Sequence, residues 1–481
     1  MTDTATEVQT PPRTPPPEPA ARRRWIADWR PEDETFWART GRRTAWRNLV
    51  FSIFVENLGF SVWSLWSIVV VSLPAAGFSF DPGSLFLLVA IPPFVGSLLR
   101  IPYTLAVPKF GGRNWTVFSG LLLLIPTGLL AYAVTEQSTP YWLFVVAAAF
   151  AGLGGGNFSS SMANISFFFP ERTKGLALGL NAAGGNIGVA AAQLFVPLVL
   201  AVGVLGAAQA DSPKPLYLQN AGLLWIPLIL LASLCGWLFM DNLTVASASL
   251  KSQLVVARRT QTWVMAVIYI GTFGSFIGYS AAFPLLIKVQ FPTAAVAGIT
   301  GVKLAFLGAL VGSLSRPFGG WLADRLGGAR VTLWVFVGTG AGVIGVLTAL
   351  NAKSFPLFLG SFIALFFMTG LGNGSSYRMI PAIWRSQAVD GINPADADAI
   401  EAATRRARTE GAAVLGFVGA IGALGGAFFP VAFKLAGVDA VSLAFYGFLG
   451  FYALCAGLTW WCYLRRSLLV TRVPSLAHAA V

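Results

Sequence analysis

Apolar residues along the chain fall into long runs separated by polar breaks. About 20 mostly apolar residues form a helix long enough to cross the hydrocarbon core of a bilayer. Twelve such runs can be placed, and the two long polar connections between them cover 241–261 and about 385–410. The pattern therefore predicts an all-α membrane protein with spans at 48–73, 84–107, 114–134, 141–168, 175–203, 221–240, 262–288, 297–323, 331–350, 355–384, 411–436 and 440–464.

Basic residues indicate the orientation of these spans. An even number of spans places both chain ends on one side. If that side is inside, the inner segments hold 25 of the 33 Lys and Arg residues, and the outer loops hold only Lys214, Lys288, Lys353 and Lys434. Cytoplasmic loops carry such an excess. The sequence therefore predicts two cytoplasmic termini, and the net charge of +13 is explained by topology, with no nucleic-acid partner.

Composition excludes several classes of protein. Apolar residues make up 56% of the chain and charged residues 11%, whereas soluble proteins carry roughly 25% charged residues. The three cysteines (Cys235, Cys455 and Cys462) lie in apolar runs without metal or disulfide spacing, and the single histidine, His478, lies near the C-terminus. We therefore expect no metal, no cofactor and no enzymatic nucleophile, base or metal set.

An internal repeat supports a duplicated architecture. Arg100 is followed by Gly111, Gly112 and Arg113, and Arg316 is followed at the same distances by Gly327 and Gly328, with Arg330 close behind. Glycine-rich segments on the fourth and tenth spans are separated in the sequence by nearly the same number of residues as Arg100 and Arg316. We predict two pseudo-symmetric six-helix bundles at 46–240 and 262–466, a linker at 241–261, and cytoplasmic tails at 1–45 and 467–481, the first of them disordered.

Arg100 and Arg316 are charges near the middle of corresponding spans. Each precedes another cation, Lys109 or Arg325, by nine residues, which is about 13 Å of helix in a core about 30 Å thick. A charge at that depth is costly and is functional by default. The planar donor fork of arginine stays charged and matches planar oxyanions. The pair predicts an anion site; the alternative is that each arginine donates only to backbone carbonyl groups.

Glu56 is the one strong acidic candidate within a span, so the two arginines leave the central cavity net positive. Three interpretations of Glu56 remain open. It is a counter-ion for an arginine, a proton carrier, or a partly hydrated carboxyl group near the inner end of its span.

Two glycine-rich motifs carry a family resemblance. Close helix packing explains many glycines in membranes. However, GGGNFSSSMANISFFFP (Gly154 to Pro170) and GNGSSYRMIP (Gly372 to Pro381) resemble the two signatures of the nitrate/nitrite porter (NarK-like) family of the major facilitator superfamily. The signature residues are Gly154, Gly155, Gly156 and Asn157, with Gly372, Asn373 and Gly374 in the second copy. GGWLADRLGGAR (Gly319 to Arg330) resembles the superfamily's inner-loop signature, which implies a gating role for Asp324 and Arg325.

The resemblance, which covers nearly all of the chain after the tail, implies the fold and the site. The implied fold is twelve helices in two bundles, and the implied substrates are nitrate and nitrite. Two arginines would clamp the anion, aromatic faces would sandwich it, and an amide and a phenol would donate hydrogen bonds to it. The matching residues are Arg100, Arg316, Phe158, Asn186, Tyr269 and Phe273.

The expected mechanism is alternating access in a bacterial cytoplasmic (inner) membrane, with the lipid bilayer and the two anions as the only partners. Exchange of nitrate for nitrite is the first expectation, and nitrate/proton symport through Glu56 is the alternative. A superfamily exporter of another small solute is a more distant one, and a channel fits the repeat less well. A monomer is expected to suffice for this cycle.

Overall fold

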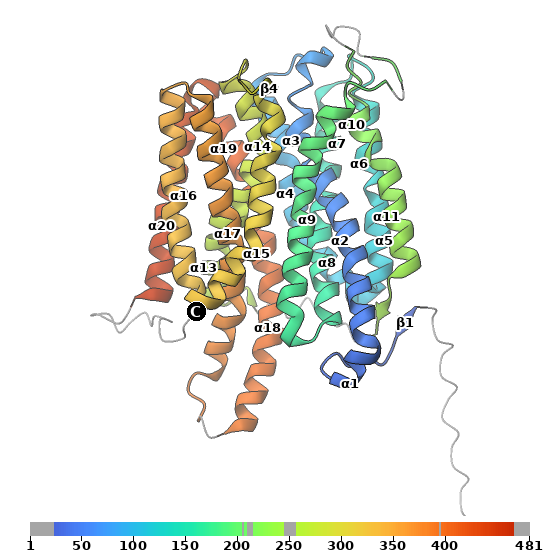
Figure 1. Ribbon diagram of the computed structural model, residues 1–481, viewed down its shortest axis with the longest axis vertical. Helices are drawn as coiled ribbons and strands as arrows, with labels where there is room; N and C mark the ends of the chain where they lie inside the picture. The colour runs from blue at the N-terminus through green and yellow to red at the C-terminus, as the bar shows by residue number, and fades with distance from the viewer. Residues whose placement is uncertain (1–23, 204–205, 209–214, 245–255, 394–395, 466–481) are drawn as a thin grey trace, which may run out of the picture.

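The computed structural model describes residues 24–203, 206–208, 215–244, 256–393 and 396–465. Its helices run in nearly the same direction and form two groups that stand side by side (Figure 1). The first group holds α2 (Arg42–Ser64), α3 (Trp66–Val69), α4 (Pro82–Phe110), α5 (Gly112–Leu122), α6 (Leu124–Ala133), α7 (Tyr141–Ala151), α8 (Leu153–Phe168), α9 (Glu171–Val199), α10 (Asn220–Leu223) and α11 (Trp225–Phe239). The 3-10 helix η2 (Pro74–Ala76) follows α3.

The second group begins after the linker. It holds α13 (Thr260–Tyr269), the π-helix η3 (Ile270–Gly274), α14 (Ser275–Gln290), η4 (Gly301–Leu304), α15 (Phe306–Leu326), α16 (Gly328–Asn351), α17 (Phe355–Val389), α18 (Ala397–Ala423), α19 (Gly425–Ala436), η5 (Val438–Ala440), α20 (Val441–Thr459) and η6 (Trp460–Leu464). Consecutive pieces such as α7 and α8 are halves of one span. The predicted all-α fold is confirmed, with only two short strand pairs added.

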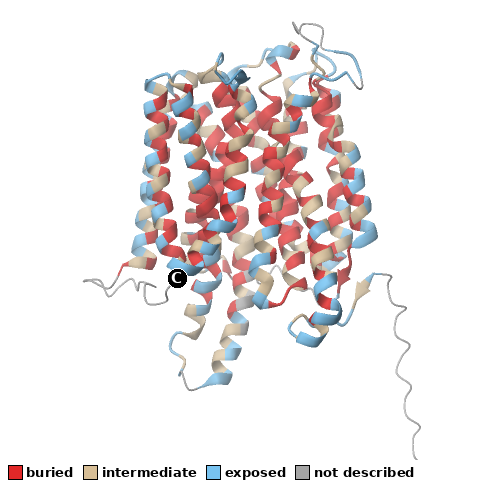
Figure 2. Ribbon diagram, in the orientation of Figure 1, coloured by how far each residue is buried: buried red, intermediate tan, exposed pale blue. Residues whose placement is uncertain are grey.

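Eleven helical stretches in the described part of the chain are long and apolar enough to cross a membrane. The predicted eighth span corresponds to α15, which has 21 residues but carries Arg316, Asp324 and Arg325 and is therefore less apolar. It packs against α17 and α9 inside the molecule. Large apolar side chains such as Trp334 and Leu435 are 72% and 80% exposed, and buried residues gather between the helices (Figure 2). Such a surface suits lipid.

The two ends of the bundle are distinguishable. One end carries the hairpin of β3 (Ala295–Val296) and β4 (Ile299–Thr300), and we call it the hairpin end. The other carries β1 (Trp25–Ile26), which pairs in parallel with β2 (Asn242–Leu243) where the linker begins, and we call it the linker end. At the linker end α17 and α18 extend beyond the other helices (Figure 1). The predicted polar connection at about 385–410 thus consists largely of extensions of spans ten and eleven.

Residues 24–45 differ from the predicted tail, whose residues 1–23 lie outside the described part. They form β1, α1 (Glu34–Phe36), η1 (Trp37–Gly41) and the start of α2. Trp29 is buried and donates from Nε1 to the carbonyl of Phe167 at 3.1 Å, and Trp37 is buried beside Phe169. Burial of these two indoles offsets the entropy of ordering the segment. The sequence did not indicate that Trp29 and Trp37 are buried, because residues 1–45 are polar on average.

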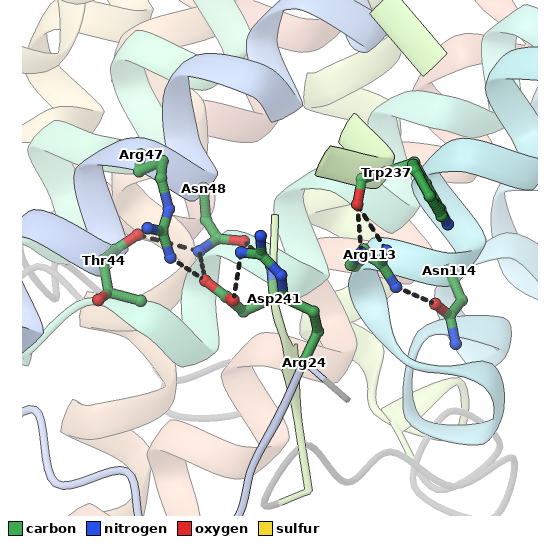
Figure 3. A network of polar contacts seen from close by, with 8 residues as sticks. All are labelled: Arg24, Thr44, Arg47, Asn48, Arg113, Asn114, Trp237 and Asp241. Atoms are coloured by element: carbon green, nitrogen blue, oxygen red, sulfur yellow. Dashed lines mark hydrogen bonds and ion pairs between the residues drawn. The ribbon is translucent and has the colours of Figure 1, made fainter. Parts of the chain in front are cut away.

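Asp241, at the start of the linker, is the centre of a polar network at the same end (Figure 3). It is 5% exposed and forms ion pairs with Arg47 and Arg24, and its carboxylate also accepts a hydrogen bond from Asn48. The backbone N–H of Asp241 donates to Asn48 Oδ1 at 2.9 Å. The network ties the N-terminal segment, α2 and the linker start together.

The internal repeat is visible in the backbone. Helices α4 and α15 end at Gly111 and Gly327, whose φ angles are 88° and 90°. Only glycine adopts that region readily. The next helices, α5 and α16, begin at once. Each arginine of the pair therefore lies the same distance from a matched helix end.

Candidate substrate-binding site

Arg100 is fully buried on α4, where the two bundles meet. Its Nη1 donates to the carbonyl oxygen of Gly419 on α18 at 2.8 Å. Its guanidinium carbon lies 4.6 Å from the ring centre of Phe158 and 5.0 Å from that of Phe273, with Trp63 at 5.7 Å. Nε and Nη2 have no hydrogen-bond partner. The backbone-only interpretation of Arg100 therefore accounts for just one of its donor groups.

Arg316 faces the same space from α15 and is 4% exposed. Its guanidinium carbon lies 5.6 Å from the ring centre of Phe158 and 5.5 Å from that of Tyr377. Its Nη1 also has no partner. Within the described residues no carboxylate lies at ion-pair distance from Arg100 or Arg316. The two guanidinium groups thus flank the ring of Phe158, and each has at least one buried N–H group without a hydrogen-bond partner.

Aromatic rings form a continuous wall beside the arginines. Phe158 and Phe273 are stacked with ring centres 6.0 Å apart, and Tyr269 stacks on Phe273 at 5.3 Å. Tyr269 precedes the π-helical turn η3, and Phe273 lies within it. Such turns occur frequently at functional sites because they change the direction of side chains within a helix. The wall joins α8 of one bundle to η3 of the other.

Asn157, Asn186 and Asn373 are all buried, but they differ in their hydrogen-bond partners. Asn373 accepts a hydrogen bond from the Tyr269 hydroxyl at 2.8 Å, and its own Nδ2 has no partner. Neither side-chain polar atom of Asn157 or of Asn186 has a partner in the protein. No described contact joins Asn186 to either arginine, so its proposed role rests on its unpartnered amide alone. Buried polar groups normally find partners, and a ligand or ordered water would supply them here.

The signature glycines pack against the helices that carry the arginines. A methyl group on Gly155 would lie 2.9 Å from the Cα of Gly96, one helical turn before Arg100. A methyl group on Gly374 would lie 2.7 Å from the backbone N of Gly320, one turn after Arg316, and closer still to the Arg316 carbonyl oxygen. The two motifs therefore hold the two arginine helices at a distance that larger residues would not allow.

Glu56, on α2, is 1% exposed, and among the described residues no cation lies at ion-pair distance from it. Its Oε2 accepts a hydrogen bond from Asn181 Nδ2 at 2.6 Å, and its Oε1 has no partner. Of the three interpretations, the partly hydrated carboxyl group does not fit this burial.

The two bundles contact each other between the arginine pair and the hairpin end. Gln193 on α9 donates from Nε2 to the carbonyl oxygen of Ser280 on α14 at 2.7 Å. Phe86 and Phe433 approach nearer the hairpin end, with ring centres 5.9 Å apart. At the linker end every ion pair among the described residues stays within one bundle. Among the described residues, therefore, no ion pair joins the two bundles at the linker end.

The predicted gating pair lies apart from the site. Asp324 forms an ion pair with Arg378 of α17, and both are exposed at the linker end of the second bundle. Arg325 lies over the ring of Trp321 at 4.2 Å. These contacts all lie within the second bundle, so their gating role stays a prediction.

Sequence reasoning missed three contacts of the site. Tyr377 follows Asn373 by one helical turn within the quoted second signature, and Trp63 lies two turns after Glu56. Helical spacing puts each on the same helix face as a candidate residue, but it does not indicate that this face meets an arginine. The carbonyl of Gly419 carries no side-chain signal. Among the described residues no group of His, Cys, Asp and Glu could hold a metal ion.

Known proteins resemble this chain over most of its length. The sequence profile of the Major Facilitator Superfamily matches residues 49–393. The nitrate/nitrite transporter NarU of Salmonella typhimurium is 42% identical over 457 residues, which cover 92% of this chain and 96% of that protein. A protein of Thermus thermophilus named "Probable nitrate/nitrite antiporter NarK2" is 36% identical over 93% of this chain and 98% of its own length.

Solved structures show the same fold at low identity. A bacterial homolog of the human lysosomal transporter Spinster, in an inward-facing and unoccupied conformation, aligns with a TM-score of 0.58 and 16% identity, over 88% of this chain and 97% of that one. The human organic anion transporter MFSD10 (TETRAN) aligns with a TM-score of 0.53 and 14% identity, over 87% and 99%.

Proposed function

The chain belongs to the nitrate/nitrite porter (NarK-like) family of the major facilitator superfamily, and we propose that it exchanges nitrate for nitrite across a bacterial cytoplasmic membrane. It is an integral membrane transporter and not an enzyme. One observation carries the substrate proposal. Two buried guanidinium groups, with unpartnered donors and no carboxylate at ion-pair distance, flank the ring of Phe158.

The site chemistry favours a small planar oxyanion. The unpartnered Nε and Nη2 of Arg100 and the Nη1 of Arg316 supply charge-assisted hydrogen bonds. The rings of Phe158 and Phe273 are stacked, and the guanidinium group of Arg100 lies against both. The free Nδ2 of Asn373, whose Oδ1 is held by the Tyr269 hydroxyl, and the amide of Asn186 complete the proposed donor set.

Transport follows from the arrangement of the two bundles. The anion binds between arginines from different bundles, and the bundles rock around it. An empty site would hold two unneutralised arginines, which repel each other, and this opposes reorientation without an anion. Loaded carriers therefore cross in both directions, and the result is one-for-one exchange.

The placement of basic residues supports the orientation. We propose that the linker end faces the cytoplasm, because the start of the linker belongs to the segments predicted to be inner, and these segments together hold 25 of the 33 Lys and Arg residues of the sequence. One monomer holds both arginines and needs no partner subunit for this cycle.

The experiment is counterflow in proteoliposomes. Labelled nitrate is followed into vesicles loaded with nitrite and into empty vesicles, each with and without an inward proton gradient. Exchange predicts uptake that requires internal nitrite. Proton-driven uptake into empty vesicles would favour symport, a second candidate that the buried carboxyl group of Glu56 supports. No nitrate movement in any vesicle would contradict the proposed substrate.

A further inference from the structure

At the linker end of the first bundle, two cations lie beside exposed aromatic rings. Arg113, at the start of α5, donates from Nε and Nη2 to the carbonyl oxygen of Trp237 on α11 at 2.9 and 2.5 Å (Figure 3). Its guanidinium carbon lies 5.8 Å from the ring centre of Trp237. Lys109, at the end of α4, places Nζ 5.3 Å from the ring centre of Phe110. We call Arg113 and Lys109 the basic cluster, and the transport cycle proposed above uses neither residue.

Arg113 is held in position but keeps donors for a further partner. A guanidinium group has five N–H groups. The two bonds to Trp237 and a third from Nη1 to Asn114 Oδ1 at 3.3 Å engage three of them. Among the described residues, no ion pair joins Arg113 or Lys109 to a carboxylate. Asp241, the carboxylate drawn near Arg113 in Figure 3, already pairs with two other arginines. The basic cluster therefore has positive charge and N–H groups available to an anion.

The internal repeat shows that this charge is particular to the first bundle. Arg325 and Asp324 follow Arg316 at the distances at which Lys109 and Pro108 follow Arg100. Asp324 forms an ion pair within the second bundle. In the first bundle a proline occupies the matching position, so no carboxylate is available there. The positive charge of the basic cluster is thus left without the compensation that the second bundle has.

The surface beside the basic cluster is suited to acyl chains. Helices α5 and α11 pack against each other. Phe118 on α5 and Trp237 on α11 are 52% and 54% exposed, and Leu121 and Leu234 are exposed further from the linker end. Such apolar surface contacts lipid in a bilayer, and tryptophan rings gather at the level of the headgroups. A phospholipid would contact both this surface and the cations, whereas a free phosphate ion would contact only the cations.

We propose that the basic cluster and the ring of Trp237 bind the headgroup of an anionic phospholipid, such as phosphatidylglycerol, whose acyl chains lie along the exposed face of α5 and α11. The lipid phosphate accepts charge-assisted hydrogen bonds from the remaining N–H groups of Arg113 and from Lys109. Basic residues at the ends of membrane helices attract anionic headgroups in this way. Phosphatidylcholine carries no net charge, and its choline group is repelled by the two cations.

The test measures lipid binding without nitrate, so its result does not depend on the proposed transport function. Purified full-length protein, freed of lipid in a neutral detergent, is titrated with phosphatidylglycerol and analysed by native mass spectrometry, which counts bound lipid molecules. Phosphatidylcholine with the same acyl chains is the comparison. The wild type should bind one phosphatidylglycerol up to about 25-fold more tightly, about fivefold for each cation. An excess of inorganic phosphate should not displace it.

Substitutions of the two cations locate the site. Lys109→Gln and Arg113→Gln should each lower phosphatidylglycerol affinity about fivefold and leave phosphatidylcholine binding unchanged. Arg113→Lys keeps the charge and should bind phosphatidylglycerol more tightly than Arg113→Gln. Lys288→Gln is the matched control, because it removes an exposed cation from the last turn of α14 at the hairpin end. It should bind both lipids as the wild type does.

Four results would overturn the proposal. They are equal affinity of the wild type for the two lipids, undiminished phosphatidylglycerol binding by folded Lys109→Gln and Arg113→Gln, an equal loss in Lys288→Gln, and displacement of the lipid by inorganic phosphate. The last would indicate a site for free phosphate instead. Arg113→Gln also loses the bonds to Trp237, so if it does not fold, Lys109→Gln decides, since Lys109 makes no hydrogen bond or ion pair within the described structure.

Discussion

Gly374→Ala should disable transport while leaving the protein folded. Gly374 lies where α17 crosses α15 at the level of Arg316. The added methyl group would meet the backbone N of Gly320 at 2.7 Å, the carbonyl carbon of Gly319 at 3.1 Å, and the Arg316 carbonyl oxygen at a shorter distance. These are backbone atoms, so no side chain can rotate away. The two helices must separate, and the Arg316 side chain moves with α15.

The expected magnitudes differ for stability and for transport. Overpacking costs about 1–3 kcal/mol. Replacing glycine by alanine in a helix returns about 1 kcal/mol. The net loss is therefore at most about 2 kcal/mol, which a folded membrane protein can tolerate. A displacement of about 1 Å at a site of fixed geometry can lower activity on the order of 100-fold. We therefore expect a large loss of exchange with a small loss of stability.

The assay is initial nitrate counterflow per amount of folded protein. Size-exclusion chromatography and thermal unfolding in detergent report the folded fraction. Gly320→Ala is the matched control, since it lies in the same turn of α15 and a methyl group there would meet nothing within 4 Å. It should transport as wild type. Normal transport by folded Gly374→Ala would refute the argument that this contact positions Arg316.

Three further changes test other parts of the structure. Tyr269→Phe removes the hydroxyl that donates to Asn373 Oδ1 at 2.8 Å, worth about 1 kcal/mol, and leaves the Asn373 amide free to turn away from the anion. Nitrate affinity should then fall by up to about fivefold; unchanged affinity in a binding titration would show that this hydrogen bond does not orient the site. Gln193→Leu removes a hydrogen bond of 2.7 Å between the bundles. A cysteine placed at Ser280 should therefore react with a thiol reagent about fivefold faster in this variant than in a protein that keeps Gln193. An equal rate in the two proteins would mean that this contact does not hold the hairpin end closed. Asp241→Asn removes the charge that pairs with Arg47, whose side chain is 36% exposed. The free energy of unfolding should fall by about 1–2 kcal/mol, measured by thermal unfolding, while exchange per folded protein is retained. An unchanged unfolding temperature would show that the network is dispensable.

The spans and the repeat could be predicted because a lipid-facing helix must be apolar over about 20 residues. The same rule made Arg100 and Arg316 conspicuous. Their depth followed from counting residues to Lys109 and Arg325, and the matched glycines at the ends of α4 and α15 agree with it. The least apolar span, α15, is the one that carries Arg316, because the site itself lowers its hydropathy.

Contacts that depend on how helices are rotated could not be predicted. Trp63 over Arg100 and Tyr377 over Arg316 lie on helices that are buried on several faces near the site, so the sequence does not indicate which face meets the arginine. The docking of Trp29 beneath α8 depends on a few aromatic side chains within a polar segment. A carbonyl partner such as Gly419 depends on backbone position alone.

Nitrate binding to purified wild type, Arg100→Lys and Arg316→Lys, followed by calorimetric titration, tests the central claim most directly. Lysine keeps the charge but loses the planar fork. Two charge-assisted hydrogen bonds at about 1.5–3 kcal/mol each correspond to a loss of at least about 100-fold in affinity. We predict that loss in both variants, each still folded. Binding as tight as wild type in either variant would contradict an anion site formed by the arginine pair.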